Sequence, residues 1–134
     1  MEGIVEATSQ FGVDGLIATN TTITRDNLNS APEEVAACGE GGLSGKPLRK
    51  KSTELISEIH RLTSGKIPII GVGGIFTATD AWEKIAAGAS LVQLYTGFIY
   101  EGPLVARRLV TGIKQLMIRD GFTKFEDAIG HQNI

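Results

Sequence analysis

Three short apolar runs divide the chain, at residues 13–18, 67–72 and 89–95, and each ends in polar or glycine residues. Runs of this length bounded by turn-forming residues predict β-strands. The second and third runs are almost continuously apolar, which is typical of parallel strands covered on both faces. We therefore expect three parallel strands, near residues 13–18, 67–72 and 89–94.

Helical spacing of apolar residues precedes the first run and follows each of the others, and the ends of these helices are marked in the sequence. Ser52 is a candidate N-cap, and Thr77 with Asp80 matches the capping-box pattern. Gly88 suits a helix C-terminus, and Pro103 suits a first helical position. With a helix between the first two runs, the order βαβαβα predicts an α/β fold.

The connection between the first strand and the next long helix is unusually long. It spans residues 22–47, and its PEEVAA segment at residues 32–37 predicts a short helix. It ends in GEGGLSGK, where four glycines in seven positions let the backbone turn sharply or approach another group. Connections of this length in a compact domain are usually functional or mobile.

Length and composition indicate one soluble globular domain of 134 residues with 42% apolar residues and a net charge of −2. This charge gives no reason to expect a nucleic-acid partner. A local basic cluster (Lys46, Arg49, Lys50 and Lys51) is either a solvated helix entrance or a phosphate-facing surface. The lone Cys38 excludes an intrachain disulfide and a cysteine-based metal site. No apolar run is long enough to span a membrane, and Met1-Glu2-Gly3 does not begin a signal peptide.

The unusual residues follow the three predicted strands, where parallel α/β folds bind their ligands. Gly73 and Gly74 have no side chains and so expose their backbone N–H groups. Together with the helix N-terminus at Thr77 they are candidates for a phosphate site. The alternative is that these glycines only permit a tight turn. The Rossmann glycine pattern fails on spacing, and residues 42–46 have lysine where a hydrolase elbow needs glycine.

Asn20 offers a carbonyl acceptor and amide donors, which suit a heterocycle that carries adjacent C=O and N–H groups. An Asx turn is the alternative role for this side chain. Tyr95 is expected to pack rather than to react. His60 lies on a predicted helix and His131 in the tail, so neither is a convincing general base, and the sequence offers no pair of base and nucleophile and no metal cluster.

Four strings at the strand ends closely resemble dihydroorotate dehydrogenase. They are ATNTT at residues 18–22, GGLSGKPL at 41–48, IPIIGVGGI at 67–75 and AGASLVQLYTGF at 87–98. The TNTT and LVQLYTGF strings look like the membrane-associated, quinone-using class 2 branch of this family. The resemblance runs in order from about residue 13 to residue 130 and covers only the C-terminal part of the family's pattern.

The resemblance implies an FMN-binding (β/α)₈ barrel, of which this chain is about the last three βα units, so residues 1–134 are expected to form a partial barrel domain. It implies that dihydroorotate contacts Asn20 and Thr21. The Gly73-Gly74 and Tyr95-Thr96 backbones match positions for the FMN phosphate. The full set of residues that match FMN-binding positions is Thr19, Gly45, Gly74, Tyr95 and Thr96.

The implied reaction is oxidation of dihydroorotate to orotate in pyrimidine synthesis, with hydride passing to FMN and a quinone reoxidising it. In the family the general base is a serine from an earlier loop, and an earlier lysine lies against the flavin. Neither has a counterpart in this chain, so no catalytic residue is assigned. A helical pair that meets the membrane is also absent, and residues 98–103 resemble part of the quinone tunnel wall.

These features leave three hypotheses. The first is the FMN and substrate side of a dihydroorotate dehydrogenase at a membrane, either the bacterial cytoplasmic membrane or the mitochondrial inner membrane. The second is another phosphate-binding βα-barrel enzyme, against which the TNTT and GGLSGKPL strings argue. The third is a non-catalytic barrel fragment that folds or binds a partner without turnover. The residues do not decide whether Met1 is a natural start.

Overall fold

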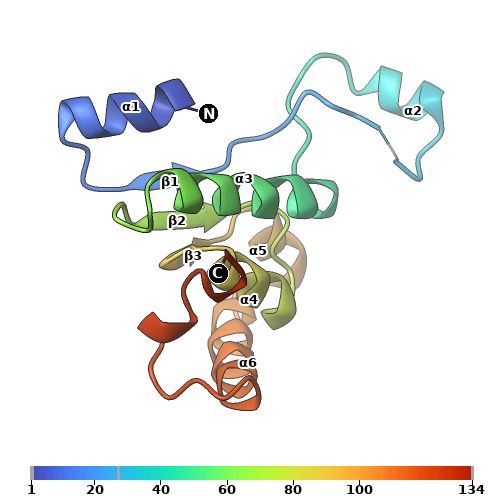
Figure 1. The fold of residues 1–134 in the computed structure, drawn as a ribbon. Coiled ribbons are helices and arrows are strands. Elements are labelled where there is room, and N and C mark those ends of the chain that lie inside the picture. The colour runs from blue at the N-terminus through green and yellow to red at the C-terminus, as the bar shows by residue number, and fades with distance from the viewer. Residues whose placement is uncertain (1, 27, 134) are drawn as a thin grey trace.

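The computed structural model describes residues 2–26 and 28–133, so Met1, Asn27 and Ile134 lie outside it. Three strands alternate with helices along the chain (Figure 1). The α-helices and strands are α1 (Glu2–Phe11), β1 (Leu16–Ala18), α2 (Pro32–Ala37), α3 (Arg49–Leu62), β2 (Ile69–Val72), α4 (Ala78–Ala86), β3 (Leu91–Gln93), α5 (Thr96–Glu101) and α6 (Val105–Arg119). The 3₁₀ turns are η1 (Lys46–Leu48), η2 (Glu126–Ala128) and η3 (His131–Asn133).

The strands form one parallel sheet in the order β1-β2-β3, which confirms the predicted strand direction. Each strand is shorter than its apolar run because pairing begins only where the chains come within hydrogen-bonding reach. Ile17 pairs with Ile70, and Ile70 pairs with Leu91, so these three residues form one row across the sheet. Ala18, Gly71 and Val92 form the next row, which points to the opposite face.

The face that carries Ala18 and Gly71 is covered by helices. Ile56 and Ile59 of α3 pack with Ala18 and Ile69 of the sheet in one buried cluster. A second cluster joins α4 to α6 and to the residue after the β2 glycines, through Ala81, Val105, Leu109 and Ile75. The C-terminal segment closes a third cluster around Trp82, whose Nε1 donates to Asp120 Oδ2 at 2.8 Å.

The opposite face of the sheet is open in the described residues. Ile17 is 66% exposed and Leu91 is 62% exposed, although both belong to strands. The expectation that the second and third strands are covered on both faces is therefore wrong for Leu91 of β3, whereas Ile70 of β2 is half-buried. A stripe of aliphatic side chains in contact with solvent is unfavourable and marks a surface that another group covers.

Most helix ends follow the local signals, and two do not. The capping box is confirmed, because Thr77 Oγ1 accepts from the amide of Asp80 and Asp80 accepts from the amide of Thr77. Gly88 follows α4 with a φ of +121°.

Ser52 is not a cap: it lies inside α3, where its hydroxyl donates to the carbonyl of Val72. Pro103 lies in the turn before α6, which begins at Val105. The short helix α5 was not predicted.

The long connection folds back on itself and carries α2 away from the sheet (Figure 1). Helix α2 spans Pro32–Ala37, as predicted, and buries none of its residues. An antiparallel bridge between Thr22 and Leu43 joins the two ends of the connection. Arg25 donates to the carbonyls of Val35 and Gly39 and so holds α2 to the loop.

Candidate ligand site at the carboxyl ends of the strands

A cavity of about 560 Å³ lies where the three strands end. It brings together the seven residues that the family resemblance assigned to ligand binding, namely Thr19, Asn20, Thr21, Gly45, Gly74, Tyr95 and Thr96. These residues come from three strand ends and from the glycine-rich end of the long connection. The four loops that carry them therefore converge at the carboxyl end of the sheet, where parallel α/β folds bind their ligands.

Thr19 supplies the clearest sign of a missing partner. Its hydroxyl Oγ1 is buried, and it is the one buried side-chain oxygen or nitrogen in the described residues that makes no hydrogen bond. Its backbone amide donates to the carbonyl of Val72 at 2.9 Å, which fixes the residue at the end of β1. The preceding peptide bond, Ala18–Thr19, is cis. An unpaired buried hydroxyl costs about 1–3 kcal/mol, so this atom is suited to a bound ligand.

Gly73 and Gly74 line the same cavity, with φ values of +120° and +70°. Within residues 2–26 and 28–133, no hydrogen bond uses the backbone amides of these two glycines. Gly74 also has a packing role, since a Cβ there would lie 2.5 Å from the backbone N and Cα of Arg49. The two glycines thus permit a tight turn and present free amides at once.

One part of the predicted phosphate site is wrong. The amides of Phe76 and Thr77 at the start of α4 are not free, because Asp80 Oδ2 accepts from them at 3.0 Å and 2.8 Å. Thr77 does not line the strand-end cavity. The protein's own carboxylate occupies this helix N-terminus, so an anion in the cavity depends on the glycine amides.

Asp80 is part of a charged network that lies behind the glycine turn. Its Oδ1 accepts from Arg49 Nη1 at 2.6 Å. Burial raises the pKa of Asp80, but hydrogen bonds from Arg49, Phe76 and Thr77 outweigh it and leave the pKa below its ordinary value. The hydrogen bond to Asp80 in turn raises the pKa of Arg49.

Lys84 of α4 completes this network from inside the protein. It is fully buried, and its Nζ donates at 2.6 Å to both the carbonyl of Arg49 and the hydroxyl of Thr53. Burial lowers the pKa of Lys84 to about 8. Sequence patterns do not predict this role of Lys84, because its partners Thr53 and Arg49 lie 31 and 35 positions away.

The amide side chain of Asn20 is only partly used within the protein. Its Oδ1 accepts from the backbone amide of Thr21 at 2.7 Å, and its Nδ2 has no partner in the described part of the chain. This contact is with the next residue, so it is not the Asx turn that was the alternative. The Nδ2 group remains available to a ligand.

Tyr95 and Thr96 form the wall of the cavity beside β3. Tyr95 is 76% exposed, so the expectation that it packs in the interior is wrong. Thr96 Oγ1 donates to Ser44 Oγ at 2.9 Å, which joins α5 to the glycine-rich loop. Ser44 also lines the cavity, and its position within GGLSGKPL was the available signal for it.

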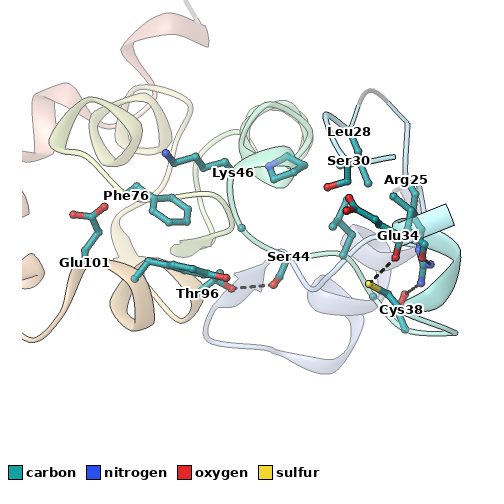
Figure 2. A pocket seen from close by; sticks show the side chains of 17 residues that line it. Arg25, Leu28, Ser30, Glu34, Cys38, Ser44, Lys46, Phe76, Thr96 and Glu101 are labelled. Carbon is teal, nitrogen blue, oxygen red and sulfur yellow. Dashed lines mark hydrogen bonds between the residues drawn. The ribbon is translucent and has the colours of Figure 1, made fainter. Parts of the chain in front are cut away.

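A larger cavity of about 910 Å³ adjoins the first on the far side of Ser44, Gly45 and Thr96. Figure 2 shows it between Glu34 of α2 with the following Cys38 on one side, and the two ends of α5, Thr96 and Glu101, on the other. Its charged groups are largely satisfied by the protein, as Arg25 binds backbone carbonyls and Glu101 pairs with Arg108 at 2.7 Å. Of the predicted ligand-binding residues, only Gly45 and Thr96 reach it.

The basic cluster does not face the strand-end cavity. None of its four members lines that cavity. Lys51 donates to the hydroxyls of Thr22 and Thr24, and Lys46 Nζ lies 5.3 Å from the centre of the Phe76 ring. This arrangement favours the solvated helix entrance over the phosphate-facing alternative. In the described residues no group of three metal-ligating side chains forms a metal site.

The histidines lie at the other end of the molecule. His60 contacts Gly88 and Gly130, and His131 packs against Trp82 and Phe122. Neither lines the strand-end cavity. The prediction that they are not general bases for this site is consistent with their positions.

The fold and the cavity define a βα-barrel type of protein with its ligand site at the carboxyl ends of parallel strands. The sequence model of the family described as "Dihydroorotate dehydrogenase" matches residues 1–117. The chain therefore belongs to the dihydroorotate dehydrogenase family.

Individual relatives agree with this assignment. The "Dihydroorotate dehydrogenase (quinone)" of Nostoc punctiforme is 50% identical over 95% of this chain and 35% of its own length. That of Deinococcus deserti is also 50% identical, over 96% of this chain. The crystal structure of ligand-free DHODH from Eimeria tenella superposes with a TM-score of 0.90 at 40% identity and covers 99% of this chain and 36% of its own. The chain spans about a third of the length of these relatives.

Proposed function

We propose that this chain supplies the FMN-phosphate side and part of the substrate side of an enzyme that oxidises dihydroorotate to orotate with a quinone acceptor. The observation that carries the proposal is the cavity at the strand ends. There one cavity is lined by Thr19, whose buried hydroxyl has no partner, and by Gly73 and Gly74, whose amides make no hydrogen bond within the described residues. Relatives named dihydroorotate dehydrogenase (quinone) support the reaction.

The residues present fit FMN in two respects. Free backbone amides at a glycine turn suit a phosphate, because they donate hydrogen bonds without a side chain in the way. The buried hydroxyl of Thr19 suits a polar atom of the flavin ring system. In this proposal FMN is held by Thr19, Gly45, Gly74, Tyr95 and Thr96. When bound, FMN accepts a hydride and delivers two electrons to the quinone.

Asn20 and Thr21 hold dihydroorotate in this proposal. The Nδ2 group of Asn20 donates to a carbonyl or carboxylate of the ring, and the Thr21 hydroxyl either donates or accepts. Their contribution is orientation, since a fixed substrate geometry lowers the barrier for the chemical step. No residue of the chain is assigned as the general base.

The quinone approaches along α5 and the turn that follows it, residues 98–103. Ile99 and Tyr100 are 66% and 77% exposed there, which gives an apolar surface next to the cavity. In the described residues no helix is long and apolar enough to cross a membrane. In this proposal the protein makes peripheral contact with a membrane, because its relatives are named for a quinone acceptor.

FMN titration of the chain tests the proposed site directly. We expect ¹⁵N-labelled protein to show shifts at the amides of Thr19, Gly74 and Thr96 on addition of FMN. We expect orotate to shift Asn20 and Thr21, and Asn20→Ala to abolish the orotate response but keep the FMN response. Shifts confined to the α2 side of the larger cavity would contradict the proposal.

A second candidate function follows from the open face of the sheet. Two exposed aliphatic residues, Ile17 and Leu91, lie in one row with the half-buried Ile70 and favour a non-catalytic fragment that binds a protein partner. This reading predicts that FMN and orotate leave the strand-end amides unchanged. The same titration therefore separates the two functions.

A further inference from the structure

Three charged residues, of which two are buried, lie directly behind the glycine turn without lining its cavity. They are Arg49 at the start of α3 and Asp80 and Lys84 on α4. None of them is among the residues that line the strand-end cavity. Their contacts converge on the two segments that shape the turn.

Asp80 fixes the chain that leaves the turn. It accepts from the amides of Phe76 and Thr77, which follow Gly74 by two and three positions. The same carboxylate is held in place by Arg49 Nη1 at 2.6 Å. The exit of the glycine turn is thereby bound to the start of α3.

The backbone of Arg49 also packs directly against Gly74, and we call this part of α3 the floor of the turn. Its backbone N and Cα lie where a Cβ of Gly74 would be, at 2.5 Å. Its carbonyl accepts from the buried Nζ of Lys84 at 2.6 Å, and Lys84 donates equally to Thr53 one turn further along α3. Lys84 thus joins the first turn of α3 to α4, and its position sets where the floor lies.

We propose that Lys84, through Arg49 and Asp80, is a positioning residue that holds the Gly73-Gly74 turn in the shape that binds the phosphate of FMN. This inference rests on the proposed function, because it assigns the phosphate to that turn. It adds that the affinity for the phosphate is set by residues that never contact the ligand. Loss of the Lys84 ammonium leaves the carbonyl of Arg49 bound only within α3, where Thr53 Oγ1 donates to it at 3.0 Å, so α4 no longer holds the floor of the turn in place.

Comparison of FMN with riboflavin, which lacks the phosphate, tests this role. We expect Lys84→Met to raise the Kd for FMN at least fivefold and to leave the Kd for riboflavin within twofold. We also expect shifted Gly73 and Gly74 amide resonances in the free variant, and faster hydrogen exchange at Phe76 and Thr77. Lys114→Met is the matched control, because Lys114 is exposed on α6, and it should change neither Kd.

A purely structural role for Lys84 gives a different result, in which thermal stability falls but the ratio of the two Kd values is unchanged. If Lys84→Met does not fold, Thr53→Val removes one acceptor of the lysine and keeps its charge, and it should raise the ratio at least twofold. An unchanged ratio in every variant that folds overturns the inference alone. Absence of FMN binding by the unchanged chain overturns the proposed function, and this inference with it.

Discussion

The hydroxyl of Thr19 is buried without a partner. A substitution that removes it should therefore affect the free energy of unfolding and the affinity for FMN in different ways. Thr19→Val keeps the shape of the side chain and deletes the unsatisfied group. We expect the free energy of unfolding to stay the same or to rise by about 1 kcal/mol. We expect the affinity for FMN to fall about three- to tenfold, the equivalent of one hydrogen bond. Urea unfolding and FMN titration measure the two effects.

Thr63→Val is the control for this experiment. Thr63 is also buried, but its hydroxyl donates to the carbonyl of Ile59 at 2.9 Å. Its loss should destabilise the protein by about 1 kcal/mol and leave FMN binding unchanged. Equal destabilisation by the two substitutions would mean that Thr19 has a partner in the folded protein.

Gly74 combines a positive φ with close packing, and the two effects are separable. Gly121 has a similar φ of +84° and no heavy atom within 4 Å of the position of a Cβ. Gly121→Ala should therefore cost only the backbone strain, about 1 kcal/mol. Gly74→Ala should cost at least about 2 kcal/mol more, because its Cβ meets the backbone of Arg49. If thermal unfolding shows similar losses of stability for Gly74→Ala and Gly121→Ala, then α3 moves to make room for the new Cβ.

At the scale of elements, the contact between α3 and α4 depends on a lysine that is buried with its charge. The pKa of Lys84 is lowered to about 8 in the folded protein, and an unfolded lysine keeps its proton to about 10.4. Between these values the unfolded chain binds more protons, so the contribution of Lys84 to stability rises with pH. We expect the unfolding free energy of the unchanged chain, minus that of Lys84→Met, to increase by about 1–3 kcal/mol from pH 8 to pH 10.

For Lys114→Met the difference in unfolding free energy from the unchanged chain should not change with pH, since the side chain of Lys114 is exposed. Urea unfolding across this pH range gives the comparison. A difference for Lys84→Met that stays flat with pH would show that the lysine titrates near its ordinary value.

The same elements show which features of the fold the sequence predicts. Local signals worked, because the capping box at Thr77 and the helix at residues 32–37 depend on neighbours within one turn. The prediction of Ser52 as a cap was wrong because its hydroxyl donates to the carbonyl of Val72, which is distant in the sequence. The strand ends were predictable since parallel strands place their carboxyl ends together. The network of Arg49, Asp80 and Lys84 was not, because it joins residues more than 30 positions apart.

At the scale of the whole molecule, the open row of side chains on the sheet predicts association. Ile17 on β1 is 66% exposed and lies at a free strand edge, which favours contact with another copy or another protein. We expect sedimentation velocity to show association that grows with concentration. Ile17→Lys should reduce it without loss of folding. Val110→Lys, at a 69% exposed site on α6, should not, and equal effects would place the contact elsewhere.

Residues 1–134 alone should show no oxidation of dihydroorotate and only weak binding of FMN. Among the described residues that line the cavity there is no carboxylate, histidine, lysine or cysteine to remove a proton, and the serine that lines it, Ser44, belongs to the glycine-rich loop, where its hydroxyl accepts from Thr96 Oγ1. Proton removal by a positioned base contributes about 10²–10⁴-fold to such reactions, and fixed geometry contributes more. A quinone-coupled assay with added FMN measures the rate. Replacing the matching third of the Nostoc punctiforme enzyme with this chain should restore turnover, and Asn20→Ala in that chimera should remove it again. Turnover by the unchanged chain as a monomer would show that these residues are sufficient for catalysis.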